Sequence, residues 1–217
     1  MLLFFVALTT CTLLQLYVIF GLANAFRIPV LQLSFGAGPT VFWSNRVRLG
    51  LFPVSGFVRF VDATDASADS PCTVFENAPL QQRLLLSLVG PLSVFVLSWL
   101  CLSEQAVTEF TELPQQLFTG AVSPFSEAPR LLSGAEQFLK DSPALLVFGV
   151  VAAKHSALNL LPLPGLNGGT FFGLLARASG LNRFWPAAAT GSLLFVLPVL
   201  FALWAIALAM YLWRAFG

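Results

Sequence analysis

Long apolar stretches dominate the chain and predict membrane-spanning helices. A helix that crosses a bilayer needs about 20 mostly apolar residues. Four segments have this character: 2–25, 84–101, 144–178 and 187–213. The third contains NLLPLPGLNGG at positions 159–169, where two prolines and three glycines oppose a continuous helix. We therefore expect an all-α polytopic membrane protein with about four spans, the third of them broken.

A different pattern separates the first two predicted helices. Residues 29–61 alternate apolar and polar side chains and are punctuated by glycine and proline. This period of two predicts short strands and turns, hence a membrane-associated β-hairpin. Residues 62–76 form a polar linker, and 104–141 form a mixed acidic and apolar loop in which we expect interfacial helices. Together the elements predict a single membrane domain over 1–217.

Composition supports a membrane protein and narrows its partners. Of the 217 residues, 57% are hydrophobic and 10% are charged, whereas a soluble domain carries about 25% charged residues. The net charge of +1 argues against a nucleic-acid partner and leaves the lipid bilayer as the expected environment. Cys11, Cys72 and Cys101 are far apart and have no Cys/His cluster around them, so they predict neither a disulfide framework nor a thiolate metal site.

Positively charged residues predict the orientation in the membrane. Segment 27–83 holds five arginines, and Arg177 and Arg183 follow the break, whereas 104–141 holds only Arg130 and Lys140. Loops rich in Lys and Arg stay on the cytoplasmic side. We therefore expect both termini on the non-cytoplasmic side, and we assign the chain to a bacterial inner membrane.

Several motifs, in order along the chain, resemble those of the site-2 protease (M50) family of intramembrane metalloproteases. They are GAGP from Gly36, LFPVSGFVR from Leu51, Arg83 followed by Gly90-Pro91, and NLLPLPGLNGG. The resemblance implies a small helical bundle with a β-hairpin after the first catalytic helix. It also implies a zinc ion held by two histidines of an H-E-x-x-H motif and by the aspartate of a Pro-x-Leu-Asp-Gly motif, with the glutamate activating water.

The sequence departs from that family pattern at every functional position. Counted back without gaps from the GAGP motif, the two histidine positions carry Gln15 and Ile19 and the glutamate position carries Leu16. The aspartate position carries Asn167, no histidine precedes His155, and residues 1–61 contain no Asp or Glu. These four positions therefore mark a vacated zinc site. We expect a pseudo-protease with no catalytic residue, metal or cofactor.

The broken helix nevertheless keeps polar groups. An unpaired amide in an apolar environment costs about 1–3 kcal/mol, so we expect Asn167 to hydrogen-bond with Gln15 and tie the break to the first helix. Other residues at or near the break are candidates for binding or structural roles: Lys154, His155, Asn159, Pro162, Pro164, Gly168 and Gly169.

Lys154 and His155 are adjacent ionisable residues in the third apolar segment. A charge at the centre of a span costs about 2.5–3.5 kcal/mol on insertion scales, and no Asp or Glu lies in any of the four predicted helices. The counter-ion of Lys154 is then a carboxylate of another chain or an anionic lipid, unless the side chain snorkels to water. A neutral, hydrogen-bonded His155 is favoured over a metal ligand because no second ligand stands near it.

These observations favour a catalytically inactive binding or assembly subunit that holds another integral membrane protein or transmembrane segment. Two alternatives stay open: an active intramembrane protease with an unrecognised site, and a conduit for a small molecule or ion that uses Lys154. The predicted hairpin also has two readings. Its edge can accept an extended peptide through backbone hydrogen bonds, or it can simply pack against the helices.

Overall fold

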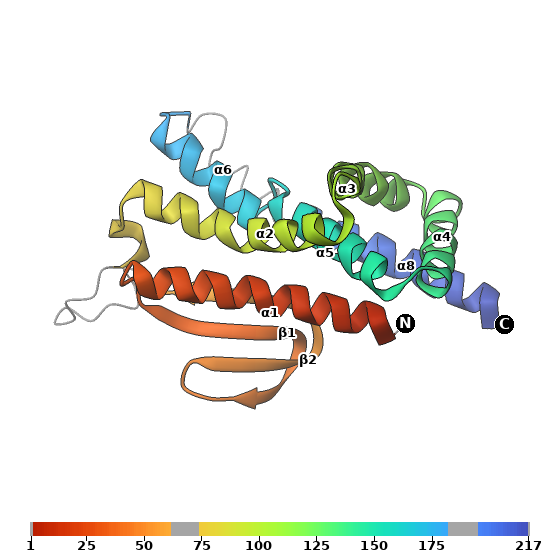
Figure 1. Ribbon diagram of the computed structural model, residues 1–217, viewed down its shortest axis with the longest axis horizontal. Coiled ribbons are helices and arrows are strands. Elements are labelled where there is room, and N and C mark those ends of the chain that lie inside the picture. Colours follow the sequence, from red (N-terminus) through yellow and green to blue (C-terminus); the bar gives the residue numbers. More distant parts are fainter. Residues whose placement is uncertain (1, 62–73, 182–194, 217) are drawn as a thin grey trace.

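The computed structural model describes residues 2–61, 74–181 and 195–216, and the described chain is mostly helical with a β-hairpin along one side (Figure 1). The elements follow one another as α1 (Leu2–Ala25), β1 (Val30–Trp43), β2 (Val47–Phe60), the 3-10 helix η1 (Phe75–Asn77), α2 (Leu80–Leu102), α3 (Gln105–Val122), α4 (Glu127–Asp141), α5 (Ala144–Leu160), α6 (Asn167–Ala178) and α8 (Val196–Phe216).

Three helices are long and apolar enough to cross a membrane: α1, α2 and the Val196–Arg214 part of α8. Helix α5 is also apolar but has 17 residues, which extend over about 25 Å at 1.5 Å per residue. That length falls short of a hydrocarbon core about 30 Å thick. The chain is thus an integral membrane protein, and the fourth span stays a prediction.

Helices α1, α2 and α5 pack against one another and form the centre of the bundle. In a bilayer no hydrophobic driving force brings helices together, so they associate largely through close packing of their backbones. Glycines make this close packing possible because they have no side chain. A Cβ atom on Gly90 of α2 would lie 2.6 Å from Cδ1 of Ile19 and 2.8 Å from Cγ of Gln15, both on α1. A Cβ atom on Gly149 of α5 would lie 2.5 Å from Cγ of Leu102. Neither position has room for a larger residue.

Two buried serines add interhelical hydrogen bonds to this packing. The hydroxyl of Ser98 on α2 donates to the carbonyl of Gly149 on α5 at 2.8 Å. In the opposite direction, the hydroxyl of Ser156 on α5 donates to the carbonyl of Pro91 on α2, also at 2.8 Å. Because both hydroxyls are buried and satisfied, they fix how α2 and α5 lie against each other.

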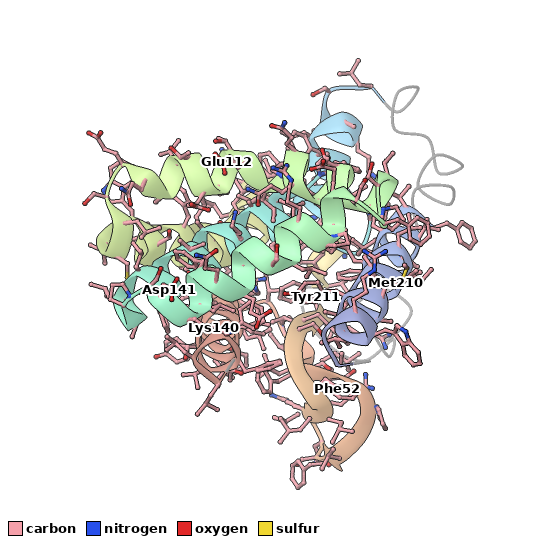
Figure 2. All side chains as sticks on the ribbon, turned by 90° about the vertical axis from the view of Figure 1, so that its right-hand side faces the viewer. Phe52, Glu112, Lys140, Asp141, Met210 and Tyr211 are labelled. Carbon is pink, nitrogen blue, oxygen red and sulfur yellow. The ribbon has the colours of Figure 1, made fainter. Side chains whose placement is uncertain are left out.

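The hairpin curls so that β1 is paired on both of its sides. Leu33, for example, pairs with Val58 near the end of β2 and also with Val47 at its start. The end of β2, residues 56–60, is therefore an outer segment that pairs only with β1 within the described chain. Its Gly56 packs against α1, where a Cβ atom would lie 2.7 Å from Cδ1 of Leu16. Phe52, in the middle of β2, lies on the part of the hairpin away from the helices (Figure 2).

Some predicted boundaries differ from the observed ones. Helix α2 begins at Leu80, four residues before the predicted start at 84, because three of these four residues, Gln81, Gln82 and Arg83, are polar and lower the local hydropathy. The predicted loop 104–141 consists largely of the two helices α3 and α4. Most of the predicted linker 62–76 and the predicted start of the last helix at 187 lie outside the described residues.

The peripheral helices α4 and α8 meet through a small polar cluster. Glu136 of α4 accepts a hydrogen bond from Lys140 at 2.6 Å and another from the hydroxyl of Tyr211 on α8. Figure 2 shows Lys140 and Tyr211 on these neighbouring helices. The bond from Lys140, followed by that from Tyr211, holds the pKa of Glu136 below its usual value.

Candidate binding site at the broken helix

The interruption of the third apolar segment is a short, tight connection. Helix α5 ends at Leu160, helix α6 begins at Asn167, and Pro162 and Pro164 lie between them. Two features of this connection require glycine. Gly165 has a φ of 89°, in the left-handed region that side chains disfavour.

The second feature is the close contact between the start of α6 and the connection itself. A Cβ atom on Gly168 would overlap the carbonyl oxygen of Leu160, and one on Gly169 would overlap that of Leu163. The first turn of α6 therefore folds back directly onto the end of α5. This close packing holds Asn167, the first residue of α6, in a defined place.

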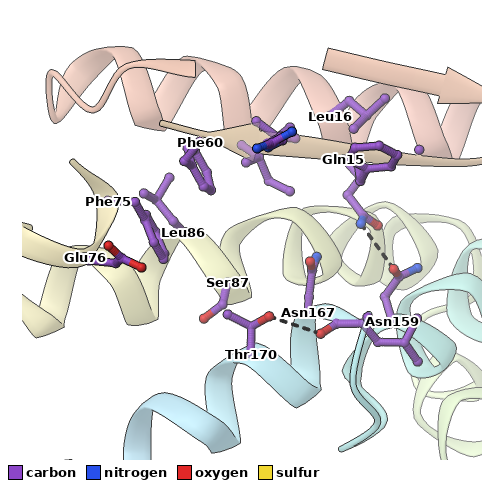
Figure 3. Close-up of a pocket in the computed structure, with 17 residues that line it drawn as sticks. Gln15, Leu16, Phe60, Phe75, Glu76, Leu86, Ser87, Asn159, Asn167 and Thr170 are labelled. Atoms are coloured by element: carbon purple, nitrogen blue, oxygen red, sulfur yellow. Dashed lines mark hydrogen bonds between the residues drawn. The ribbon is translucent and has the colours of Figure 1, made fainter. Parts of the chain in front are cut away.

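A cavity of about 390 Å³ lies beside this connection, between α1, the end of β2, α2 and α6. Figure 3 shows Gln15 and Leu16 of α1 on one side of it, and Asn159 and Asn167 on the other. Ile19 lines the same cavity. The structure thus brings all four positions of the predicted vacated zinc site together, although Asn167 is about 150 residues away from the others in sequence.

A network of neutral groups connects α1 to α5 at this cavity. The side-chain nitrogen of Gln15 donates to Oδ1 of Asn159 at 3.3 Å, and Oε1 of Gln15 lies 3.2 Å from Nε2 of His155. Asn159 Nδ2 donates in turn to the backbone carbonyl of His155 at 2.9 Å. Because an amide oxygen can only accept, Nε2 of His155 carries the proton in this arrangement. The hydrogen-bonded His155 that the sequence predicted is therefore present.

The predicted hydrogen bond between Gln15 and Asn167 is wrong. The partner of Gln15 is Asn159, which lies one helical turn after His155 and so shares its face of α5. The Nδ2 atom of Asn167 is buried and has no hydrogen-bond partner in the described part of the chain. Asn167 is thus a lining residue of the cavity whose amide nitrogen is buried and unused.

Lys154 has its counter-ion inside the chain, contrary to the prediction of a second chain, a lipid or water. Its Nζ atom lies 2.9 Å from Oε2 of Glu109 and donates to Oε1 of Gln116 at 2.8 Å. Both partners belong to α3, which packs against α5. They are seven residues apart and therefore share one helix face, a spacing that could have indicated a partner for Lys154. A conduit that uses Lys154 would need an ammonium group free to contact the transported ion or molecule. The ammonium group of Lys154 is instead paired with Glu109 and Gln116, which argues against this alternative.

Comparison with known proteins places the chain in a family. Residues 20–203 match the family model described as peptidase family M50. The chain belongs to peptidase family M50. The match begins directly after Ile19, so it does not include the three cavity positions on α1. A putative zinc metalloprotease of Thermotoga maritima is 32% identical over 77 residues, which are 32% of this M50 chain and 15% of that relative.

The side chains that line the cavity of this M50 protein do not fit a zinc ion. Zinc in proteins is bound by thiolate, imidazole and carboxylate groups. The four cavity positions supply two amides and two alkyl groups, and the nearby His155 is already bonded to Gln15. Over residues 2–61, 74–181 and 195–216, no group of three His, Cys, Asp or Glu residues is placed to hold a metal ion. The cavity can instead offer hydrogen bonds and apolar contacts.

Proposed function

We propose that this M50 protein is catalytically inactive and binds a transmembrane segment of another integral membrane protein without cutting it. The observation that carries the proposal is the chemistry of the cavity. Gln15, Leu16, Ile19 and Asn167 converge where the family resemblance expects zinc ligands and a base, and none of them can perform either task. Amides in these places recognise a peptide backbone instead, because they donate and accept hydrogen bonds without ionising.

The position of the end of β2 favours the binding of a ligand in an extended conformation. Residues 56–60 line the cavity and pair with β1 on one side only within the described chain. An extended peptide can extend such a sheet edge through its backbone groups. The cavity volume of about 390 Å³ lies within the range of about 300–1,000 Å³ typical of ligand pockets. A partly unwound membrane segment would meet the end of β2 on one side and the amide side chains of Asn159 and Asn167 on the other.

We also propose that the chain sits in a bacterial inner membrane with both termini on the non-cytoplasmic side. The end of α1, the start of α2 and the end of α6 lie at one end of the molecule, and both termini lie at the other (Figure 1). Arg27, Arg83 and Arg177 accompany the first of these ends. The positive-inside rule favours the cytoplasmic side for it.

Two measurements test the loss of catalysis. Metal analysis of the purified full chain should give far less than stoichiometric zinc. Incubation in proteoliposomes with a single-span membrane protein as substrate should leave that protein intact. Stoichiometric zinc, or cleavage that a chelator abolishes, would support the alternative of an active protease and overturn the proposal.

Site-specific photo-crosslinking tests the binding role. A photoreactive residue in place of Phe57, which is 50% exposed beside the cavity, should form an adduct with an intact membrane protein in cells. The matched control is the same residue in place of Phe201, which is 56% exposed on α8 and does not line the cavity. Protein adducts of equal yield at both positions, or lipid adducts alone at Phe57, would contradict a binding site at the cavity.

A further inference from the structure

A second cavity, of about 520 Å³, opens where the start of α2 meets the end of α6. It is separate from the site at the broken helix, since the two cavities share only Glu76 among their lining residues. The residues that line it are Glu76, Leu80, Arg83, Leu174, Arg177 and Ala178. Its walls therefore combine two guanidinium groups, one carboxylate and three apolar side chains.

The charge in this cavity is unbalanced. Arg83 and Arg177 bring two positive charges to the same space, and Glu76 brings one negative charge. Arg83 is also held in place, since its Nη1 donates to the backbone carbonyl of Glu76 at 3.2 Å and its guanidinium carbon lies 5.2 Å from the ring centroid of Phe75. Its Nε atom is buried and has no hydrogen-bond partner in the described part of the chain. An anion at this cavity would relieve the repulsion between the two arginines.

The cavity lies at the end of an apolar helix long enough to cross a membrane. Leu80 is the first residue of α2, whose apolar span runs from Leu80 to Leu102, so Arg83 stands in the first turn of a membrane helix. Arg177 stands in the last turn of α6 at the same end of the molecule (Figure 1). A pair of arginines at the boundary between the apolar core and water can reach phosphate groups of the bilayer.

We propose that this cavity binds the phosphate group of an anionic phospholipid. Guanidinium groups match phosphate oxygens in a bidentate way, more specifically than an ammonium group does. Basic pockets between membrane helices are a recurring place for anionic headgroups. Leu80, Leu174 and Ala178 would contact the glycerol and the first methylenes of the acyl chains. Free phosphate shares the same recognition chemistry, but the apolar walls of the cavity and its place at the end of a membrane helix favour the lipid.

The inference is independent of the proposed pseudo-protease function and can be tested on the full chain in detergent. Native mass spectrometry would measure retention of phosphatidylglycerol and of phosphatidylcholine with the same acyl chains. Phosphatidylglycerol should bind more tightly. Arg83→Gln and Arg177→Gln should each weaken it about fivefold, and the double variant about 25-fold, as expected for roughly 1 kcal/mol per basic residue near a membrane surface. Glu76→Gln should strengthen it.

Arg130→Gln is the matched control, because it removes one positive charge from an exposed side chain on α4. It should leave phosphatidylglycerol binding unchanged. Thermal unfolding in phosphatidylcholine shows whether the variants fold. If a glutamine variant does not fold, the double variant Arg83→Lys and Arg177→Lys is measured in its place. The lysine pair keeps the charge and should bind with intermediate affinity. Equal retention of the two lipids, or equal effects of Arg130→Gln and the cavity variants, would overturn the proposal. Competition by inorganic phosphate at the same concentration as the lipid would identify a soluble phosphate site and overturn the lipid assignment.

Discussion

Lys154 and His155 are neighbours on α5, yet they belong to two polar clusters of different kinds. Lys154 faces α3 and forms an ion pair with Glu109, supplemented by Gln116. His155 faces α1 and takes part in a neutral network with Gln15 and Asn159. Successive residues of a helix point in directions about 100° apart, so a single step along α5 separates a charged cluster from an uncharged one.

The ion pair of the charged cluster is more exposed to solvent than Gln15 of the neutral cluster. The side chains of Lys154 and Glu109 are 28% and 30% exposed, so each retains part of its solvation. Gln15 is only 5% exposed and lies at the wall of the cavity beside the broken helix. A charge needs a counter-ion and access to water at membrane depth, whereas amides can satisfy one another. The M50 fold here keeps the Lys154–Glu109 charge pair partly exposed and neutral amides at the cavity beside the broken helix.

The largest effect is expected from returning metal ligands to the neutral cluster. In the triple variant Gln15→His, Ile19→His and Asn167→Asp, two imidazoles at i and i+4 share one helix face with a carboxylate opposite. The variant should bind stoichiometric zinc with an apparent dissociation constant of about 1 μM or tighter, a free energy of about 8 kcal/mol. The wild type should not. Equilibrium dialysis with metal analysis measures both proteins.

The control for this experiment keeps two of the three ligands. In Gln15→His, Ile19→Leu and Asn167→Asp, the second imidazole is replaced by an alkyl group of similar size. This variant should lose most of the zinc affinity, because three protein ligands are needed for a tight site. Equal zinc binding by the two variants, or none by either, would show that these positions do not form the former ligand set.

The next effect concerns the charged cluster. Glu109→Gln leaves Lys154 without its counter-ion, and the free energy of unfolding should fall by about 2 kcal/mol, less than for a fully buried pair because both side chains keep some water. Denaturant titration in mixed micelles measures the change. The same substitution in the exposed pair of Arg130, Glu127→Gln, should cost less than about 1 kcal/mol. Restoring neutrality with Lys154→Met in the Glu109→Gln background should recover most of the loss. Equal costs for the two single variants would contradict the role of the ion pair.

The neutral cluster should be less sensitive. Gln15→Leu removes both of its hydrogen bonds and leaves the Nε2 proton of His155 and Oδ1 of Asn159 without this partner. The expected cost is about 1–2 kcal/mol. The nitrogen NMR signals of His155 should also shift, since the hydrogen bond to Nε2 is lost. Gln116→Leu is the matched change in the charged cluster and should cost less, because Glu109 still pairs with Lys154. If Gln116→Leu instead lowers the free energy of unfolding more than Gln15→Leu does, the hydrogen bonds of Gln15 add no stability beyond its packing.

The comparison also shows what could be predicted from sequence. Pro162 and Pro164 predicted the break between α5 and α6, and the alternating stretch predicted the hairpin, because both are local patterns. The partner of Lys154 was missed because Glu109 lies on another element, and hydropathy carries no information on which helices pack together. The convergence of Gln15 with Asn167 on one cavity followed from the family resemblance. The actual bond to Asn159 depends on side-chain reach, which spacing along the chain does not fix.

The smallest effect on stability is expected at Asn167, the member of the site without a partner. Because its Nδ2 atom makes no hydrogen bond within the described residues, Asn167→Ala should change the free energy of unfolding by no more than about 0.5 kcal/mol. Asn159→Ala, which loses the bonds to Gln15 and to the His155 carbonyl, should cost about 1 kcal/mol or more. The same Asn167→Ala change should nevertheless reduce photo-crosslinking from position 57, since an amide side chain is then absent from the lining of the cavity. If Asn167→Ala instead destabilises the protein as much as Asn159→Ala and leaves crosslinking unchanged, Asn167 is a structural residue rather than a contact for a bound segment.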